Sequence, residues 1–245
     1  MAFTNKLQLL IPKQHGAWGM LTIPFFLGAY AGGFTWFHIP LFIGWLALYL
    51  ATYALLTAIK LKRKKEYLSW FYRYISVAVM MLLIPIYSHM KLIYFGIAMI
   101  PFFIVNMYYA RKKKERVLVN DVAAITNFCI GGIASFYIGS GQFNMNALEL
   151  FMFCFLFFIG STFYVKTMIR EKNNPVYKWL SWSYHLLLII GLICAGYPMF
   201  VVAYIPSMIR AFYLYGKSLP IKKIGVSEIV NAVYFLAAMM FLFHG

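Results

Sequence analysis

Nine apolar runs follow one another along this chain, joined by short connections. They lie near residues 17–34, 38–59, 72–88, 91–109, 119–139, 147–167, 177–195, 197–215 and 224–243. Each run has about 17 to 22 residues, and an α-helix of that length crosses the roughly 30 Å hydrocarbon layer of a bilayer. Hydrophobic residues make up 63% of the chain and charged residues only 11%, far from the composition of soluble domains. The sequence therefore predicts an all-α, polytopic integral membrane protein with about nine transmembrane helices.

The parts of the chain outside these runs are too short to build a second core, so we expect one transmembrane domain over residues 1–245. The segment AYAGG at 29–33 is a weak signal-peptide cleavage pattern, but Trp18 and Pro24 in the preceding run favour a packed helix. Three cysteines fall inside apolar runs without the spacing of a metal or redox pair. We expect small buried side chains at Cys129, Cys154 and Cys194.

Basic residues are distributed very unevenly between the two ends of the predicted bundle. Clusters follow the second, fourth, sixth and eighth runs, and of the 22 Lys and Arg residues only Lys91 falls at the opposite end. By the positive-inside rule, these loops and the N-terminus are predicted to be cytoplasmic and the C-terminus to lie outside the cell membrane. The net charge of +16 then belongs mainly to one face, where it attracts anionic lipid headgroups. The sequence has no nucleic-acid-binding motif, so we expect no nucleic acid partner.

Polar and small residues recur at helical spacing near the predicted cytoplasmic end of several runs. The fifth run carries Asn120, Ala124, Asn127, Gly131 and Ser135. The sixth run ends with Thr162, Lys166 and Arg170, followed by Glu171. The eighth run ends with Tyr204, Ser207 and Arg210, and the ninth begins with Glu228, Asn231 and Tyr234. Ionisable groups inside a membrane usually face a protein interior or a water-filled cavity, so these stripes predict a site in the cytoplasmic half of the bundle.

Each stripe also has a simpler explanation. Small residues on the fifth run permit close helix packing, and Lys166 and Arg170 can extend to the membrane surface. Asp121 and Glu228 stand near helix starts, where a carboxylate is favoured. His185 is explained equally well as a hydrogen-bonded interior histidine or as a ligand. The site is favoured because six runs supply polar groups at matching depth, the first through Lys13, His15 and Trp18 and the seventh through His185.

Three segments resemble those of the YwiC-like proteins and of the UbiA superfamily of intramembrane prenyltransferases. They are PKQHGAWGMLTIPFFLGAY before and within the first run, MYYARKKKER at the end of the fourth and YVKTMIREKNN at the end of the sixth. The second segment resembles a Tyr-x-x-x-Lys element of the superfamily at Tyr109 and Lys113. The resemblance implies a UbiA-like helical bundle whose partners are membrane lipids and an isoprenoid diphosphate or a quinone.

Enzymes of the UbiA superfamily hold the diphosphate through magnesium ions bound by two Asp-rich motifs, because hard cations need carboxylate oxygens. This chain departs from that pattern at both positions: no acidic residue precedes Glu66 after the second run, and the sixth run ends with the single carboxylate of Glu171. One replacement is direct binding of an anionic substrate by cations, here Lys113, Lys166, Arg170 and Arg210. The other is one magnesium ion held by Asp121, Glu171 and Glu228, and the cofactor requirement stays open between them.

We therefore predict a UbiA-like prenyltransferase, or a degenerate relative that binds a prenyl or phosphorylated lipid in a cytoplasmic-leaflet cavity. The candidate catalytic residues are Asp121, Lys166, Arg170 and Glu171. The candidate substrate-binding residues are Lys13, His15, Trp18, Tyr109, Lys113, Asn120, Asn127, His185, Arg210, Glu228 and Asn231. One alternative is a non-catalytic lipid- or quinone-binding protein. Another is a transporter of a small anion, because Pro24, Pro85, Pro101 and Pro206 fall inside runs and could mark kinked or discontinuous helices. A haem site is not favoured, because the histidines do not pair at one depth.

Overall fold

The computed structural model describes residues 10–12, 15–61, 64–172 and 174–243. Within them the chain forms nine α-helices, a π-helical turn η1 and a short 3₁₀ turn η2. The first helices are α1 (His15–Gly32), α2 (His38–Lys60), α3 (Lys64–Ser88), α4 (Leu92–Arg111) and α5 (Leu118–Ser140). They are followed by α6 (Met145–Val165), η1 (Lys166–Arg170), α7 (Pro175–Cys194), η2 (Pro198–Phe200), α8 (Val201–Tyr213) and α9 (Ile221–Leu242). The predicted all-α class is confirmed.

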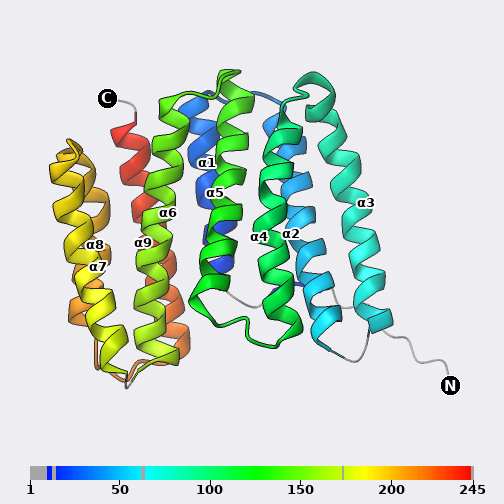
Figure 1. The fold of residues 1–245 in the computed structure, drawn as a ribbon. Coiled ribbons are helices and arrows are strands. Elements are labelled where there is room, and N and C mark those ends of the chain that lie inside the picture. Colours follow the sequence, from blue (N-terminus) through cyan, green and yellow to red (C-terminus); the bar gives the residue numbers. More distant parts are fainter. Residues whose placement is uncertain (1–9, 13–14, 62–63, 173, 244–245) are drawn as a thin grey trace.

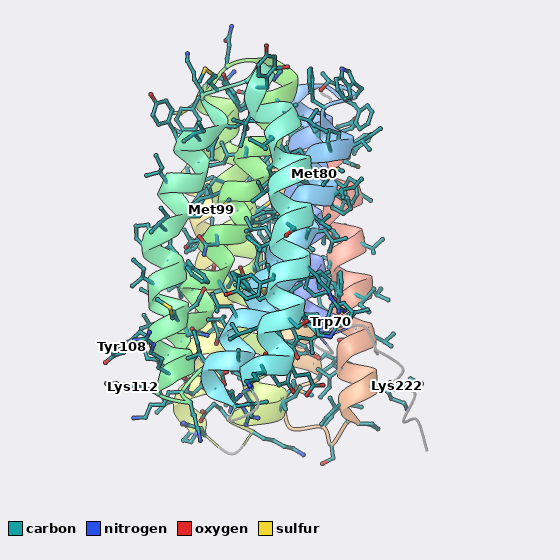
Figure 2. All side chains as sticks on the ribbon, turned by 90° about the vertical axis from the view of Figure 1, so that its right-hand side faces the viewer. Trp70, Met80, Met99, Tyr108, Lys112 and Lys222 are labelled. Atoms are coloured by element: carbon teal, nitrogen blue, oxygen red, sulfur yellow. The ribbon has the colours of Figure 1, made fainter. Side chains whose placement is uncertain are left out.

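Successive helices run in opposite directions, as Figure 1 shows. The connections after α2, α4, η1 and α8 lie at the lower end of that view, and the C-terminus lies at the upper end. The lower end is called the basic end here because the Lys and Arg clusters of these connections gather there. Figure 2 shows Lys112 and Lys222 at this end, with Met80 and Met99 nearer the middle of the bundle. That the basic end faces the cytoplasm stays a prediction.

Seven of the described helices are long and apolar enough to cross a membrane: α2, α3, α4, α5, α6 with η1, α7 and α9. The chain is thus a multi-pass membrane protein, and seven of the nine expected spans meet this criterion of length and composition among the described residues. In α1, His15 and four glycines dilute the apolar residues over 18 positions. The eighth run forms the shorter segment Pro198–Tyr213, in which a 3₁₀ turn leads into α8.

Helix α5 is the centre of the bundle. In its apolar window 78% of the residues are buried, against 11% in α4. Backbone lies directly on backbone between α1 and α5, since a Cβ atom added to Gly28 would overlap the carbonyl oxygen of Gly132. The Ser135 hydroxyl donates a 2.7 Å hydrogen bond to the carbonyl oxygen of Phe25 across the same contact. Small residues permit such approach in membranes, where packing rather than the hydrophobic effect holds helices together.

This packing explains part of the polar stripe on the fifth run. Gly131 accommodates the ring of Trp45 on α2, and Ser135 faces α1. The upper half of the stripe is therefore a packing face between helices and not the wall of a cavity. One cysteine also differs from expectation: Cys129 and Cys154 are buried, but Cys194 at the end of α7 is exposed.

Candidate functional site

The strongest polar centre lies among α6, α8 and α9, toward the basic end. Arg210 on α8 is 7% exposed, and its Nη1 atom lies 2.5 Å from Oε1 of Glu228 on α9. The Ser161 hydroxyl on α6 donates a hydrogen bond to the other carboxylate oxygen of Glu228. Helix α6 thus meets the consecutive helices α8 and α9 at one ion pair, which we call the Arg210 centre.

The guanidinium group of Arg210 is only partly used by the protein. Its Nη1 also donates a 3.2 Å hydrogen bond to the carbonyl oxygen of Ser227, and its Cζ lies 4.1 Å from the centre of the Tyr164 ring. Both Nε and Nη2 are buried and have no hydrogen-bond partner among the described residues. A buried charged donor without an acceptor is costly and rare in native proteins, so this arrangement has donors to spare for an anion.

Two further polar pairs flank the Arg210 centre. The Asn231 side-chain nitrogen donates a 2.9 Å hydrogen bond to the Ser207 hydroxyl, one helical turn from Arg210 on α8. His185 on α7 is buried, and its Nδ1 donates a 2.7 Å hydrogen bond to the carbonyl oxygen of Ser181. Nε2 of neutral His185 is therefore an acceptor, and it has no partner within the described part of the chain.

A second ion pair joins the end of α6 to the start of α5. Lys166 is 3% exposed, and its Nζ atom lies 2.9 Å from Oδ2 of Asp121. The same ammonium group donates a 2.6 Å hydrogen bond to the carbonyl oxygen of Arg116 in the preceding loop. Lys166 thus points inward and holds the connection between α4 and α5; it does not extend to the membrane surface.

The predicted common face of Lys166 and Arg170 is wrong. Helix α6 changes to the π-helical turn η1 at Lys166, and the wider turn rotates the following residues. Lys166 is buried whereas Arg170 is exposed. Glu171 ends the turn and accepts a 3.0 Å hydrogen bond from Asn174 nearby in the same loop. Arg170 and Glu171 are therefore not brought to either ion pair.

The segment that resembles the Tyr-x-x-x-Lys element does not lie on one helix. Helix α4 ends at Arg111, and Lys113 has a left-handed backbone with φ of 54°. The side chain of Lys113 is exposed, and the Tyr109 ring packs edge-on against Tyr108. The chain turns here because the next residues form the loop to α5, so this Tyr-x-x-x-Lys segment does not form one helical face.

The other predicted residues have varied positions. Asn120 bridges α4 and the loop, since it accepts from Asn106 and donates to the carbonyl oxygen of Glu115. The side-chain oxygen of Asn127 is buried without a partner in the described residues. The Trp18 ring lies edge-on to Tyr49 on α2. Lys13 and the side chain of His15 lie outside the described part.

The carboxylates do not assemble into a metal site. Among the described residues, no group of three His, Cys, Asp or Glu side chains has a geometry that suits a metal ion. Asp121 is paired with Lys166, Glu228 with Arg210, and Glu171 with its own loop. The donor set proposed for one magnesium ion therefore does not fit this structure.

Sequence reasoning missed several residues that hold these groups in place. Ser161, Tyr164 and Ser227 all touch the Arg210 centre. A signal existed for two of them: Ser161 and Tyr164 lie three residues apart on the sixth run, as residues of one helix face do. At the opposite end His38, expected outside the membrane, is 1% exposed and donates a 2.9 Å hydrogen bond to the Ser135 carbonyl oxygen.

Comparison with known proteins gives the family. A model of the family described as YwiC-like protein matches residues 11–136. The protein of Bacillus subtilis (strain 168) that bears the name YwiC is 47% identical over 235 residues, which cover 95% of this chain and 98% of that protein. This chain belongs to the YwiC-like family. A protein of Haemophilus influenzae is 37% identical over 235 residues, covering 96% of this chain and 99% of the relative.

The YwiC-like family model ends within α5, before the helices that form the Arg210 centre. The two relatives cover nearly the whole chain, so their similarity extends across α6 to α9 as well. With these bacterial relatives and seven candidate spans, the YwiC-like chain is a multi-pass protein of the cell membrane. No solved structure matches it.

Proposed function

We propose that the protein binds a phosphorylated prenyl lipid at the basic end of the bundle, with Arg210 as the main ligand of the phosphate. One observation carries this proposal: Arg210 is buried, yet Nε and Nη2 lack partners among the described residues. A guanidinium fork matches phosphate oxygens with two parallel hydrogen bonds, and such charge-assisted bonds are strong in a dry interior.

The prenyl part of the proposal rests on the sequence resemblance to the UbiA superfamily. A lipid tail also suits a site that opens within a membrane-spanning bundle and not in an aqueous domain. The protein departs from UbiA enzymes in its charges, because cations stand where those enzymes have magnesium-binding carboxylates. The proposal is therefore binding of the phosphate by Arg210 directly, and no step of it uses a metal ion.

Lys166 contributes indirectly in this proposal. Its ammonium group is engaged by Asp121 and by the Arg116 carbonyl oxygen. The ion pair fixes the π-helical turn after α6, and α6 carries Ser161 and Tyr164 against Arg210. We therefore assign Lys166 and Asp121 to positioning of α6 and not to phosphate contact.

Binding of farnesyl diphosphate and of inorganic diphosphate to purified protein tests the proposal, together with mass spectrometry of lipids that co-purify. The informative variant replaces both members of the ion pair, Arg210→Gln with Glu228→Gln, so that no unpaired charge stays buried. We expect both ligands to bind about ten- to a hundredfold more weakly, because a hydrogen bond to a charged group contributes about 1.5–3 kcal/mol.

Arg170→Gln is the matched control, because Arg170 is also an arginine near the basic end of the α6–α9 region but is exposed. It should bind both ligands as the unaltered protein does, and thermal unfolding should show that both variants are folded. Unchanged affinity in the Arg210/Glu228 double variant would refute the proposal. Release of inorganic diphosphate from farnesyl diphosphate in the presence of membrane quinones would add transferase activity to binding.

A further inference from the structure

A membrane-facing groove of about 640 Å³ lies between α8 and α9, on the outer side of the Arg210 centre. One face of α9 forms most of its wall, since the lining residues recur every three or four positions from Lys222 to Tyr234. The twelve steps along the helix from Lys222 to Tyr234 rise by roughly 18 Å. The groove thus begins at the basic end, where Figure 2 shows Lys222, and reaches well into the apolar zone.

The chemistry of the wall changes along this rise. Lys222 and Lys223 stand at the lower end, and both are exposed. Above them come the exposed apolar side chains of Val226 and Val230, at 52% and 63% exposure. A cationic mouth followed by an apolar wall is complementary to an anionic headgroup followed by a hydrocarbon tail.

The floor of the groove is polar over one helical turn. Ser227 and Asn231 line it, and the backbone carbonyl of Ser227 already binds Arg210 behind it. Asn231 is 5% exposed, and its side-chain oxygen has no partner in the described parts of the chain. Among the described residues, the Asn231 side chain is hydrogen-bonded to the Ser207 hydroxyl, a group that can donate or accept. The Asn231 amide can therefore present either its oxygen or its nitrogen to a ligand.

A proline defines the opposite wall and the upper end. Pro206 on α8 has no N–H, so the carbonyl oxygen of Val202 one turn earlier has no helical donor. The Tyr234 hydroxyl supplies that hydrogen bond at 3.2 Å. This bond ties α9 to α8 at the upper end of the groove.

We propose that this groove binds the phosphorylated prenyl lipid from the side of the bilayer, with the phosphate at the level of Ser227 and the tail along Val230 to Tyr234. The lysines lie one turn below that level and Asn231 one turn above it, so both reach a phosphate held there. The inference rests on the proposed function, and it adds the route of entry and the site of the tail.

Comparing a ligand that has a prenyl tail with one that has none tests this inference separately from the proposed function. The experiment measures binding of inorganic diphosphate, which has no tail, and of farnesyl diphosphate to the purified protein in detergent micelles. Val230→Trp fills the groove, and Val233→Trp is the matched control because Val233 is an equally exposed valine of α9 that does not line it. We expect Val230→Trp to weaken farnesyl diphosphate binding about tenfold or more, since the lost burial of about two CH₂ groups suffices for that factor.

Inorganic diphosphate should bind to Val230→Trp within about twofold of the unaltered protein, while the exchange of Lys222 and Lys223 for Gln should weaken both ligands. Equal effects of the two tryptophan variants would overturn the groove inference and leave the proposed role of Arg210 intact. If Val230→Trp abolishes farnesyl diphosphate binding but the Arg210/Glu228 exchange has no effect, the groove inference stands and the proposed role of Arg210 is refuted. If ordinary anionic phospholipids co-purify with the protein and the unaltered protein binds no farnesyl diphosphate, both proposals fail.

Discussion

Lys166 at the end of α6 lies 2.9 Å from Asp121 at the start of α5, and this ion pair is nearly closed to solvent on the lysine side. The same loop is held from the other side by a more exposed pair, Lys60 on α2 with Glu115, at 2.6 Å and with side chains 39% and 35% exposed. The α4–α5 connection is thus fixed by two lysines that differ in burial. Comparing the two pairs therefore shows how much burial changes the contribution of an ion pair to the free energy of unfolding.

We predict that Asp121→Asn lowers the free energy of unfolding by about 3 kcal/mol, because it leaves the buried ammonium group of Lys166 without its counter-charge. Glu115→Gln, the corresponding change in the exposed pair, should cost less than about 1 kcal/mol. Denaturant unfolding in micelles measures both. Adding Lys166→Met to Asp121→Asn should restore most of the loss, and equal losses in the two amide variants would contradict the assignment.

The contact between α1 and α5 gives a second prediction. Gly28→Ala forces a methyl group into the Gly132 carbonyl oxygen, and overpacking of this kind costs about 1–3 kcal/mol. Gly96→Ala on α4 is the control, since nothing lies within 4 Å of its added Cβ, and it should stabilise the protein by up to about 1 kcal/mol. Thermal unfolding of the two variants should therefore shift in opposite directions.

His38 gives a third prediction, at the end of the bundle away from the basic loops. Its Nδ1 accepts from the Thr35 N–H at 3.0 Å, so Nε2 carries the proton that it donates to Ser135. His38→Leu removes both bonds from a buried place and should cost about 2 kcal/mol or more. His89→Leu should change stability little, because His89 Nδ1 has no partner in the part of the chain that the structure describes. Similar unfolding temperatures for both variants would refute this role.

The predicted orientation is tested by cysteine labelling in intact cells, in a variant whose own three cysteines are replaced. Gln142→Cys lies in the exposed connection from α5 to α6, and Ser218→Cys lies in the connection from α8 to α9 at the basic end. A membrane-impermeant maleimide should label Gln142→Cys from outside and Ser218→Cys only after lysis. The reverse labelling pattern would show that the basic end faces the outside of the cell.

The positions of the helices, and the residues that α8 and α9 contribute to the Arg210 centre, could be predicted from the sequence. Apolar runs of spanning length located the helices, and the 3.6-residue period placed Ser207 with Arg210, and Glu228 with Asn231, on common faces. Both faces do meet in the structure, through Arg210–Glu228 and Asn231–Ser207. The roles of these residues in binding stay predictions.

Other features had no local signal. Regular helical spacing predicts a common face for Lys166 and Arg170, but the segment KTMIR forms a π-helical turn, which that spacing does not reveal. The helix that carries Tyr109 ends at Arg111, so the four-residue spacing from Tyr109 to Lys113 does not place both residues on one helix. The pairing of α1 with α5 depends on contacts between distant segments, which periodicity within one run does not reveal.

The close contact of α1 with α5 also has a consequence for biosynthesis. Phe25 and Ser135, which form a hydrogen bond across it, are 110 residues apart in the chain. A ribosome that adds about 5–20 residues per second needs on the order of 5–20 s to make the intervening chain. During that time the glycine-lined side of α1 has no partner of its own chain, so the newborn helix depends on lipid or on the insertion machinery until α5 is delivered.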